Sequence, residues 1–315
     1  MMTPLVTVHI TSYNRFFHLK NLLDSFVQCN EYENIEMIIV DNGSTDPRLL
    51  NYYDQLDLPF PFQLIRNKEN DYPRCIWHAK NQARTAAKGE YFLDIPDDHQ
   101  FVRKGNWIRE CIDIDSSIEN VGSIVLYAYN IFRWTKPNNR LHKESSINNI
   151  PFFISHFKGY ADYHFMSRSV YEKVGPFLDV GYDDRKIPEP DYMTRCTNLG
   201  LRRLFLKYPA AVPVPDHLNE QLMELTSHPV YPYLSRKDYI PWSTLPRPVS
   251  AQELRHLAQS WHIAHSQNPL QISLVESAMQ EETRSLKEVK GLTIFDSIIS
   301  RIKRRIIQSI TARIG

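Results

Sequence analysis

Short apolar runs alternate with segments of helical spacing through the first hundred residues, and this alternation limits the folds open to the chain. The expected strands cover residues 5–10, 35–40, 62–66 and 90–95, and helical patterns lie between them. A repeated strand–helix–strand order predicts an α/β fold with a mostly parallel sheet. In such a sheet, ligands bind beyond the carboxyl ends of the strands.

The remainder of the chain predicts a less regular organisation. A further strand is expected at 121–129, and a helix that enters another strand at 187–207. Eight of the 20 prolines fall between Pro209 and Pro248, a density typical of an irregular linker. Two helices with capping boxes follow, so we expect an α/β domain over 1–217, a proline-rich wrap or linker over 218–249 and a helical extension over 250–315.

The extension ends in a basic amphipathic segment that begins at Thr293. Five isoleucines lie on one side of its helical wheel and three arginines lie on or near the other: Ile298, Ile299, Ile302, Ile306 and Ile310 against Arg301, Arg304 and Arg305. This pattern favours peripheral contact with an anionic membrane surface. The alternative is a helix packed on the catalytic domain or on a protein partner.

Charge and cysteine content give little information about partners. Lys and Arg total 37 and Asp and Glu total 36, so no overall field favours nucleic acid, and we expect no nucleic-acid partner. The four cysteines have no short pairing spacing, and no stretch resembles a signal peptide or a membrane-spanning run. A cytoplasmic location is therefore expected, with the membrane contact on the cytoplasmic face.

Polar clusters follow three of the predicted strands. TSYNR (11–15) follows the first, DNGSTD (41–46) the second and DIPDDH (94–99) the fourth, so all three should converge at one edge of the sheet. The last cluster places Asp94, Asp97 and Asp98 within five residues, where they repel one another unless a cation lies among them. Because GxGxxG and P-loop motifs are absent, a diphosphate would need a carboxylate-bound divalent cation, Mn²⁺ or Mg²⁺.

These segments resemble the family 2 glycosyltransferases, which have a GT-A fold. VTVHITSYNR, EMIIVDNGSTD, RNKEN and AKNQARTAAKGEYFLDIPDDH follow one another in the family's order over residues 4–110, with a weaker similarity over 159–217. The resemblance implies that residues 1–217 form a catalytic domain that binds a nucleotide-sugar. Asp41 would read the base, and the residues expected along the nucleotide are Thr11, Tyr13, Arg15, Asn42 and Arg66.

The family's Asp-X-Asp-like metal triplet falls on Pro96, Asp97 and Asp98. Asp98 is then the expected metal ligand, and Asp97 a ribose or metal contact. Asp94 would be structural. His99 is expected at the surface or beside the ligands. Two arginines, Arg66 and Arg74, are candidates for steadying a diphosphate, with an ordinary solvated arginine as the alternative.

The acceptor side is implied by a later segment, VGPFLDVGYDDRKIPEPDYMTR (174–195). The family's spacing places two acids, Glu189 and Asp191, ahead of Arg195, and its general base maps to Glu189. Asp191 has a structural alternative, an i,i+4 ion pair with Arg195, and Glu189 is expected at or just before the N-cap of the helix. His217 is expected near the metal or diphosphate, with a structural histidine as the alternative.

The resemblance implies metal-dependent, inverting transfer of a sugar from a nucleotide-diphosphate sugar to a glycan or lipid-linked acceptor, in cell-surface polysaccharide synthesis. Two alternatives remain. A sugar-phosphate nucleotidyltransferase should have a glycine-rich, arginine-containing loop after its first strand, and TSYNR has no glycine. A non-catalytic nucleotide- or glycan-binding relative should lack the acids that this chain has.

Overall fold

A computed structural model of the chain describes residues 3–70, 75–127, 142–155, 165–178 and 188–214, together with Met223 and Tyr233. The chain divides into two compact units, Met1–Val214 with Ser227–Pro248, and Pro215–Thr226 with Val249–Gly315. Every described residue except Met223 belongs to the first unit, whose fold follows. The expected boundaries at 217 and 249 and the basic C-terminal segment lie outside the described residues and stay predictions.

The main sheet has a parallel half and a mixed half. Its strands are β1 (Val6–Ser12), β2 (Ile35–Asp41), β3 (Phe62–Arg66), β4 (Tyr91–Pro96), β6 (Val121–Val125), β7 (His142–Ile147), β8 (Ile150–Ser155), β9 (Phe165–Ser167) and β10 (Arg202–Leu206). Within the described residues they run in the order β3-β2-β1-β4-β9-β6-β10-β8-β7. The first four are parallel, β10 is parallel to β6, and β9, β8 and β7 are antiparallel to their neighbours. The predicted α/β fold is confirmed, and the parallel half is the one that the polar clusters follow.

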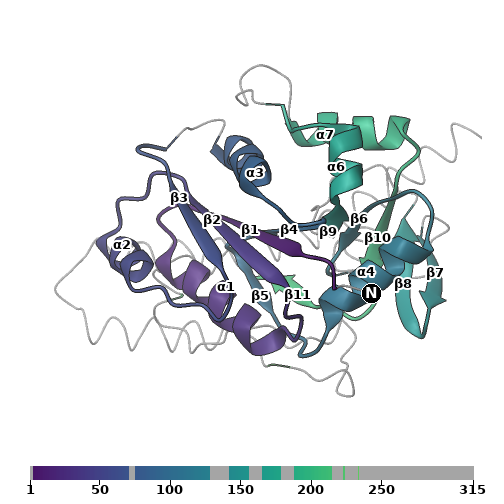
Figure 1. Cartoon of the computed structure of the whole chain (residues 1–315), viewed down its shortest axis with the longest axis horizontal. Coiled ribbons are helices and arrows are strands. Elements are labelled where there is room, and N and C mark those ends of the chain that lie inside the picture. Colours follow the sequence, from purple (N-terminus) through teal and green to yellow (C-terminus); the bar gives the residue numbers. More distant parts are fainter. Residues whose placement is uncertain are drawn as a thin grey trace, which may run out of the picture. The chain divides into compact units, whose positions relative to one another are not determined.

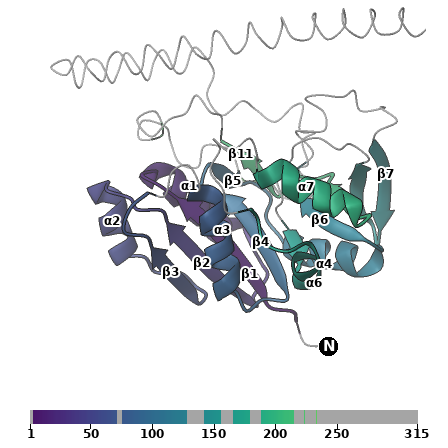
Figure 2. The same cartoon turned by 90° about the horizontal axis from the view of Figure 1, so that it is seen from above.

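Helices cover both faces of this sheet (Figures 1 and 2). One face packs against α1 (Phe16–Cys29), α2 (Pro47–Asp54) and α4 (Trp107–Ser117), and the other against α3 (Cys75–Ala86), α6 (Arg168–Val174) and α7 (Pro188–Asn198). The strands alternate accordingly: Met37 and Ile39 of β2 belong to the core under α1, whereas Ile38 and Val40 belong to the core under α3. Burial on both faces explains why these strands read as continuous apolar runs.

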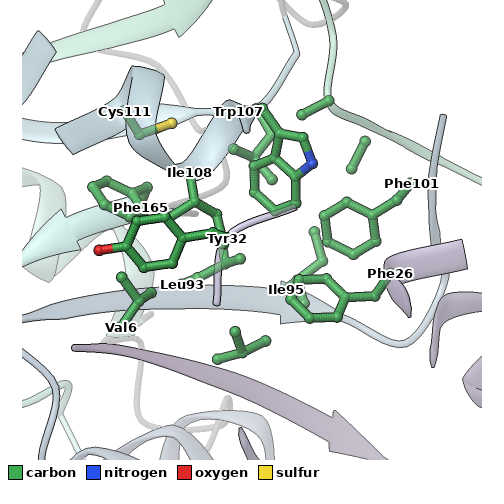
Figure 3. Close-up of a cluster of buried hydrophobic side chains, with 14 of the residues drawn as sticks. Val6, Phe26, Tyr32, Leu93, Ile95, Phe101, Trp107, Ile108, Cys111 and Phe165 are labelled. Atoms are coloured by element: carbon green, nitrogen blue, oxygen red, sulfur yellow. The ribbon is translucent and has the colours of Figure 1, made fainter. Parts of the chain in front are cut away.

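An aromatic cluster in the first core fixes the chain just after the predicted metal motif. Strand β5 (His99–Phe101) pairs with β11 (Ala211–Pro213) in a small antiparallel sheet. The ring of Phe101 lies 5.0 Å from that of Phe26 in α1 and 5.0 Å from that of Trp107 in α4, and Figure 3 shows the three side chains together. All three are buried. The Asp97–Asp98 turn is therefore held between two rigidly packed strands, β4 and β5.

Candidate active site

The three polar loops meet at the carboxyl ends of β1, β2 and β4. Arg15, which follows β1, donates from Nη1 to Oδ1 of Asp97 at 3.2 Å, and the same nitrogen lies 3.5 Å from Oδ2 of Asp98. The predicted convergence is confirmed for these residues. Since β1 and β4 are adjacent parallel strands, the contact joins two loops that are 82 residues apart in sequence.

Asn14 joins the loop after β1 to the loop after β2. Its backbone has a left-handed φ of +52°, a conformation that asparagine tolerates better than most residues. Its backbone N–H donates to Oγ of Ser44 at 2.9 Å, and its Oδ1 accepts from the backbone N–H groups of Thr45 and Asp46 at 2.8 and 2.9 Å. The TSYNR and DNGSTD loops are therefore one hydrogen-bonded unit, which the sequence pattern did not identify.

Asp41, the predicted base-reading residue, ends β2 and is 1% exposed. Its Oδ1 accepts from the backbone N–H of Ser44 at 3.1 Å, and its Oδ2 lies 3.7 Å from Nε of Arg66. Gly43 allows this turn: its φ is +79°, and a Cβ there would lie 2.3 Å from the carbonyl carbon of Glu69. Asp41 and Arg66 are thus adjacent, and their contact with a nucleotide stays a prediction.

Asn42 lies on the other side of the same turn and is also buried. Its Oδ1 accepts a hydrogen bond from Nδ2 of Asn67 at 3.1 Å, and Asn67 exchanges two hydrogen bonds of 3.1 Å with Gln82 of α3. The Asn42 amide therefore already joins β2, β3 and α3. Its contact with a nucleotide stays a prediction.

Asp97 and Asp98 form a two-residue turn after Pro96 ends β4. Asp97 is buried and Asp98 is partly open, with 38% of its side chain exposed. Burial raises the pKa of Asp97 to about 6, against the opposing effect of Arg15. Burial also acts to raise the pKa of Asp98, but the hydrogen bond with His99 and the nearby positive charges lower it to about 2. The carboxyl of Asp98 therefore ionises readily, whereas the ionised form of Asp97 would be stabilised by a further positive charge.

A divalent cation suits this donor set in part. Carboxylate oxygens are the ligands that Mg²⁺ and Mn²⁺ prefer, and the half-open Asp98 can be reached from solvent. Within the part of the chain that the structure describes, no group of three or more His, Cys, Asp or Glu side chains could hold a metal. The two aspartates would therefore act together with water, phosphate oxygens or residues outside that part, as is usual for Mg²⁺.

Helix α7 contains both acceptor-side acids. It begins at Pro188, so Glu189 lies inside the first turn rather than at or before the N-cap as predicted. Proline is favoured at the first helical position, which accounts for the earlier start. Oδ2 of Asp191 accepts from Nε of Arg195 at 2.8 Å, which confirms the expected i,i+4 ion pair. Arg195 also donates to the carbonyl oxygens of Val174 and Pro176, so Asp191 helps to anchor α7 to the end of α6.

The other predicted site residues vary in their placement. Thr11 and Tyr13 lie at the end of β1 and just beyond it, and Tyr13 is 43% exposed at the same edge as the acids. His99 is buried, with Nδ1 2.9 Å from Oδ1 of Asp98, so of its two expected positions it has the one beside the predicted ligands. Arg74, His217 and the side chain of Glu189 lie outside the described residues.

Asp94 has the structural environment that was expected. It is 1% exposed and its Oδ2 accepts from Nη2 of Arg84 in α3 at 2.6 Å. Its Oδ1 lies 3.0 Å from Nδ1 of His9 in β1. Sequence reasoning did not identify His9 and Arg84, although an ionisable residue inside each of two buried strands was a signal that they pair.

The sheet order and the contact of Arg15 with Asp97 and Asp98 together define a class of protein. It is an α/β domain of the GT-A type, with an acid pair beside an arginine in the loops at the strand ends. Residues 7–175 match the family described as Glycosyl transferase family 2, and the chain belongs to that family.

Curated relatives match over part of their length. An uncharacterized glycosyltransferase of Rickettsia felis is 28% identical over 150 residues, which are 44% of this chain and 23% of the relative. One of Haemophilus influenzae is 28% identical over 109 residues, 35% of this chain and 32% of the relative. This chain thus matches about a third or less of the length of either relative.

Solved structures resemble the chain at low identity. Residues 1–349 of S. aureus TarS in complex with UDP-GlcNAc are 15% identical with a TM-score of 0.48, covering 88% of this chain and 71% of that one. The mannosyltransferase PcManGT from Pyrobaculum calidifontis, in complex with GDP-Man and Mn²⁺, is 15% identical with a TM-score of 0.46, covering 93% and 81%.

No helix in the described ranges combines the length and the apolar character needed to cross a bilayer. Cys29, Cys111 and Cys196 are buried free thiols.

Proposed function

We propose that this chain transfers a sugar from a nucleoside-diphosphate sugar to a hydroxyl group of a glycan or lipid-linked acceptor, with inversion at the anomeric carbon. The observation that supports this most directly is the contact of Arg15 with both Asp97 and Asp98. It joins the loop expected along the nucleotide to the acids expected at the diphosphate. Membership of glycosyl transferase family 2 supports the same reaction.

The donor would lie across the carboxyl ends of β2, β1 and β4. Asp41 would contact the base, and Arg66, 3.7 Å from the Asp41 carboxylate, would lie along the nucleotide with Thr11 and the exposed ring of Tyr13. Arg15 would then stand between the nucleotide and the acid pair. Because Asn14 joins the two loops by four hydrogen bonds, little ordering of the backbone would be needed on binding.

In the proposed step, the acceptor oxygen forms a bond to the anomeric carbon while the bond from that carbon to the diphosphate oxygen breaks. The bonding electrons leave with the nucleoside diphosphate. The acceptor proton moves to a carboxylate, which we assign to Glu189 in the first turn of α7. Asp191 is engaged by Arg195 and would hold the helix in place.

Asp98, with Asp97, would hold a divalent cation, Mn²⁺ or Mg²⁺, and His217 is a further candidate ligand. The cation would supply positive charge at the leaving diphosphate. Arg15 contributes positive charge of its own to the same acids.

A donor panel tests the proposal. The full chain is incubated with nucleotide-sugars and Mn²⁺ or Mg²⁺, and released nucleoside diphosphate is measured. Release supports the proposal. Formation of pyrophosphate from a nucleoside triphosphate and a sugar phosphate would instead identify a nucleotidyltransferase, and nucleotide binding without any turnover would identify a non-catalytic relative.

Asp98→Asn is expected to weaken Mn²⁺-dependent binding of a nucleoside diphosphate by at least about 10- to 100-fold, since even outer-shell changes at metal sites cost that much. The fold should be retained because the side chain is partly exposed at a turn. Calorimetric titration with and without Mn²⁺ measures the effect. Asp24→Asn on α1, which removes an exposed carboxylate paired with Lys20, serves as the matched control. Equal affinity in Asp98→Asn and the wild type would exclude Asp98 as a ligand.

The basic tail is proposed to bind the cytoplasmic face of an anionic membrane, as would suit an enzyme of cell-surface polysaccharide synthesis. We expect the full chain to co-sediment with vesicles that contain anionic lipid, and a chain ending at Lys290 to stay in the supernatant. Neutral vesicles are the control, because the arginines should not bind them. Equal pelleting of the two chains would contradict the proposal and favour the packed-helix alternative.

A further inference from the structure

A buried polar chain lies on the α3 side of the sheet, beneath the candidate active site. His9 of β1 and Asp94 of β4 are register partners in adjacent strands, and Arg84 of α3 covers them. Their exposed fractions are 3%, 1% and 2%. Asp94 contacts both partners, with Oδ1 at 3.0 Å from His9 Nδ1 and Oδ2 at 2.6 Å from Arg84 Nη2.

One end of this polar chain is Thr11, on the donor side. Nε2 of His9 lies 3.0 Å from Oγ1 of Thr11. An ionised carboxylate only accepts hydrogen bonds, so Nδ1 of His9 has the proton that faces Asp94. Burial lowers the pKa of His9 despite Asp94, so the ring is neutral at pH 7 and Nε2 accepts from the Thr11 hydroxyl. The direction of each hydrogen bond is thereby fixed.

The other end is α7, on the acceptor side. The guanidinium carbon of Arg84 lies 4.7 Å from the ring centre of Tyr171, 4.6 Å from that of Phe177 and 5.6 Å from that of Tyr192. Tyr192 is 1% exposed and is three residues beyond Glu189 in α7. Figures 1 and 2 show α3, α6 and α7 on the same side of the sheet. The side chain of Arg84 therefore contacts both Asp94 of β4 and helix α7, which contains the two acceptor-side acids.

Stability alone does not explain this arrangement. A buried ion pair loses the hydration of both charges, and apolar residues of similar volume often stabilise a fold equally well or better. Apart from Asp94, Arg84 contacts Sδ of Met166, 3.6 Å from Nη2, and the rings of Tyr171, Phe177 and Tyr192. Met166, Phe177 and Tyr192 belong to the apolar core under α3. An ion pair differs from an apolar contact because it fixes the relative orientation of the groups that it joins. A planar guanidinium binds a carboxylate at its edge and stacks on aromatic rings with its face.

We propose that Arg84 is a positioning residue that, through Asp94 and His9 on one side and Tyr192 on the other, holds the first turn of α7 in register with the donor strand β1. The inference rests on the proposed function, in which α7 provides the base and β1 leads into the donor loop. It assigns to three buried residues an effect on the geometry of the reaction rather than on substrate contact.

The test replaces the whole polar chain by apolar residues of similar size, in the triple variant His9→Leu/Arg84→Met/Asp94→Leu of the full chain. The melting temperature should stay at or above that of the wild type. The KM for the donor should change little, whereas kcat should fall about 10- to 100-fold, the loss expected from a displaced catalytic group. Hydrogen–deuterium exchange should become faster in residues 188–198 and stay unchanged in β1 and β2.

Arg168→Met is the matched control. Arg168 also has a guanidinium over an aromatic ring, 4.9 Å from Phe92, but it donates to the carbonyl oxygens of Gly89 and Ala87 before the start of β4. The Arg168→Met variant should have a lower melting temperature and an unchanged kcat. A triple variant with wild-type kcat and wild-type exchange in α7 would overturn the inference. If the wild type releases no nucleoside diphosphate, the proposed function fails, and the exchange of residues 188–198 alone decides whether Arg84 orders α7.

Discussion

Glu189→Gln is expected to lower the rate of sugar transfer by about 10²- to 10⁴-fold, the usual contribution of a well-placed general base. The amide has the size of the carboxylate but cannot take the acceptor proton. Donor affinity and melting temperature should remain those of the wild type, because the substitution is confined to the first turn of α7 and leaves the Asp191–Arg195 pair intact. Single-turnover transfer and calorimetric donor titration measure the two quantities separately.

Asp191→Asn is the natural comparison, two residues along the same helix. It removes an i,i+4 ion pair and a negative charge near the helix N-terminus, worth together about 0.5 to 1.5 kcal/mol. Arg195 keeps its bonds to the Val174 and Pro176 carbonyl oxygens, so α7 should stay attached. We therefore expect a slightly lower melting temperature with transfer retained. A stable but inactive Asp191→Asn, beside an active Glu189→Gln, would assign the base to Asp191 instead.

The fold could be predicted well where local pattern and tertiary environment agree. Strands buried on both faces must be apolar throughout, so VTVHI, IEMIIV and EYFLDI were recognisable without any partner. Their parallel order then fixed the edge at which their loops meet. The antiparallel strands β7, β8 and β9 were not predicted. β9 has three residues, and β7 (HKESSI) lacks the apolar character that identifies a buried strand.

The sequence predicted which residues form the candidate site, but not which of them contact one another. The sequence indicated that Asp97 and Asp98 need a cation, but only the fold brings Arg15 to them across 82 residues. Likewise, the register of β1 and β4 brings His9 to Asp94, and the packing of α3 on the sheet brings Arg84 to Asp94. Pairing between strands depends on register, and register depends on the whole sheet rather than on any local window.

Asp94→Asn is expected to destabilise the fold by about 3 to 5 kcal/mol, the loss typical of breaking one side of a buried ion pair. The neutral amide fits the space but leaves the guanidinium of Arg84 buried without a counter-charge. The aromatic rings beside Arg84 replace little of the stabilisation that Asp94 gives, since a cation–π contact contributes roughly 0.5 to 2 kcal/mol. The triple apolar variant removes the charge as well and should avoid this loss, so comparing the two separates an unpaired charge from a lost contact.

The pH dependence of this loss has a definite sign. Burial alone would raise the pKa of Asp94, but Arg84 and the hydrogen bond from His9 hold it well below its usual range. A carboxyl with a lowered pKa in the folded state stabilises that state above the unfolded pKa of about 3.9, and the stabilisation is lost as the pH falls. Urea titrations should therefore show the full difference between wild type and Asp94→Asn at about pH 7 and a smaller one below about pH 4.

Asp113→Asn, which breaks an exposed pair with Arg109, should cost less than about 1 kcal/mol at either pH. An Asp94→Asn variant as stable as that control would mean that the Arg84 charge is compensated by groups other than Asp94.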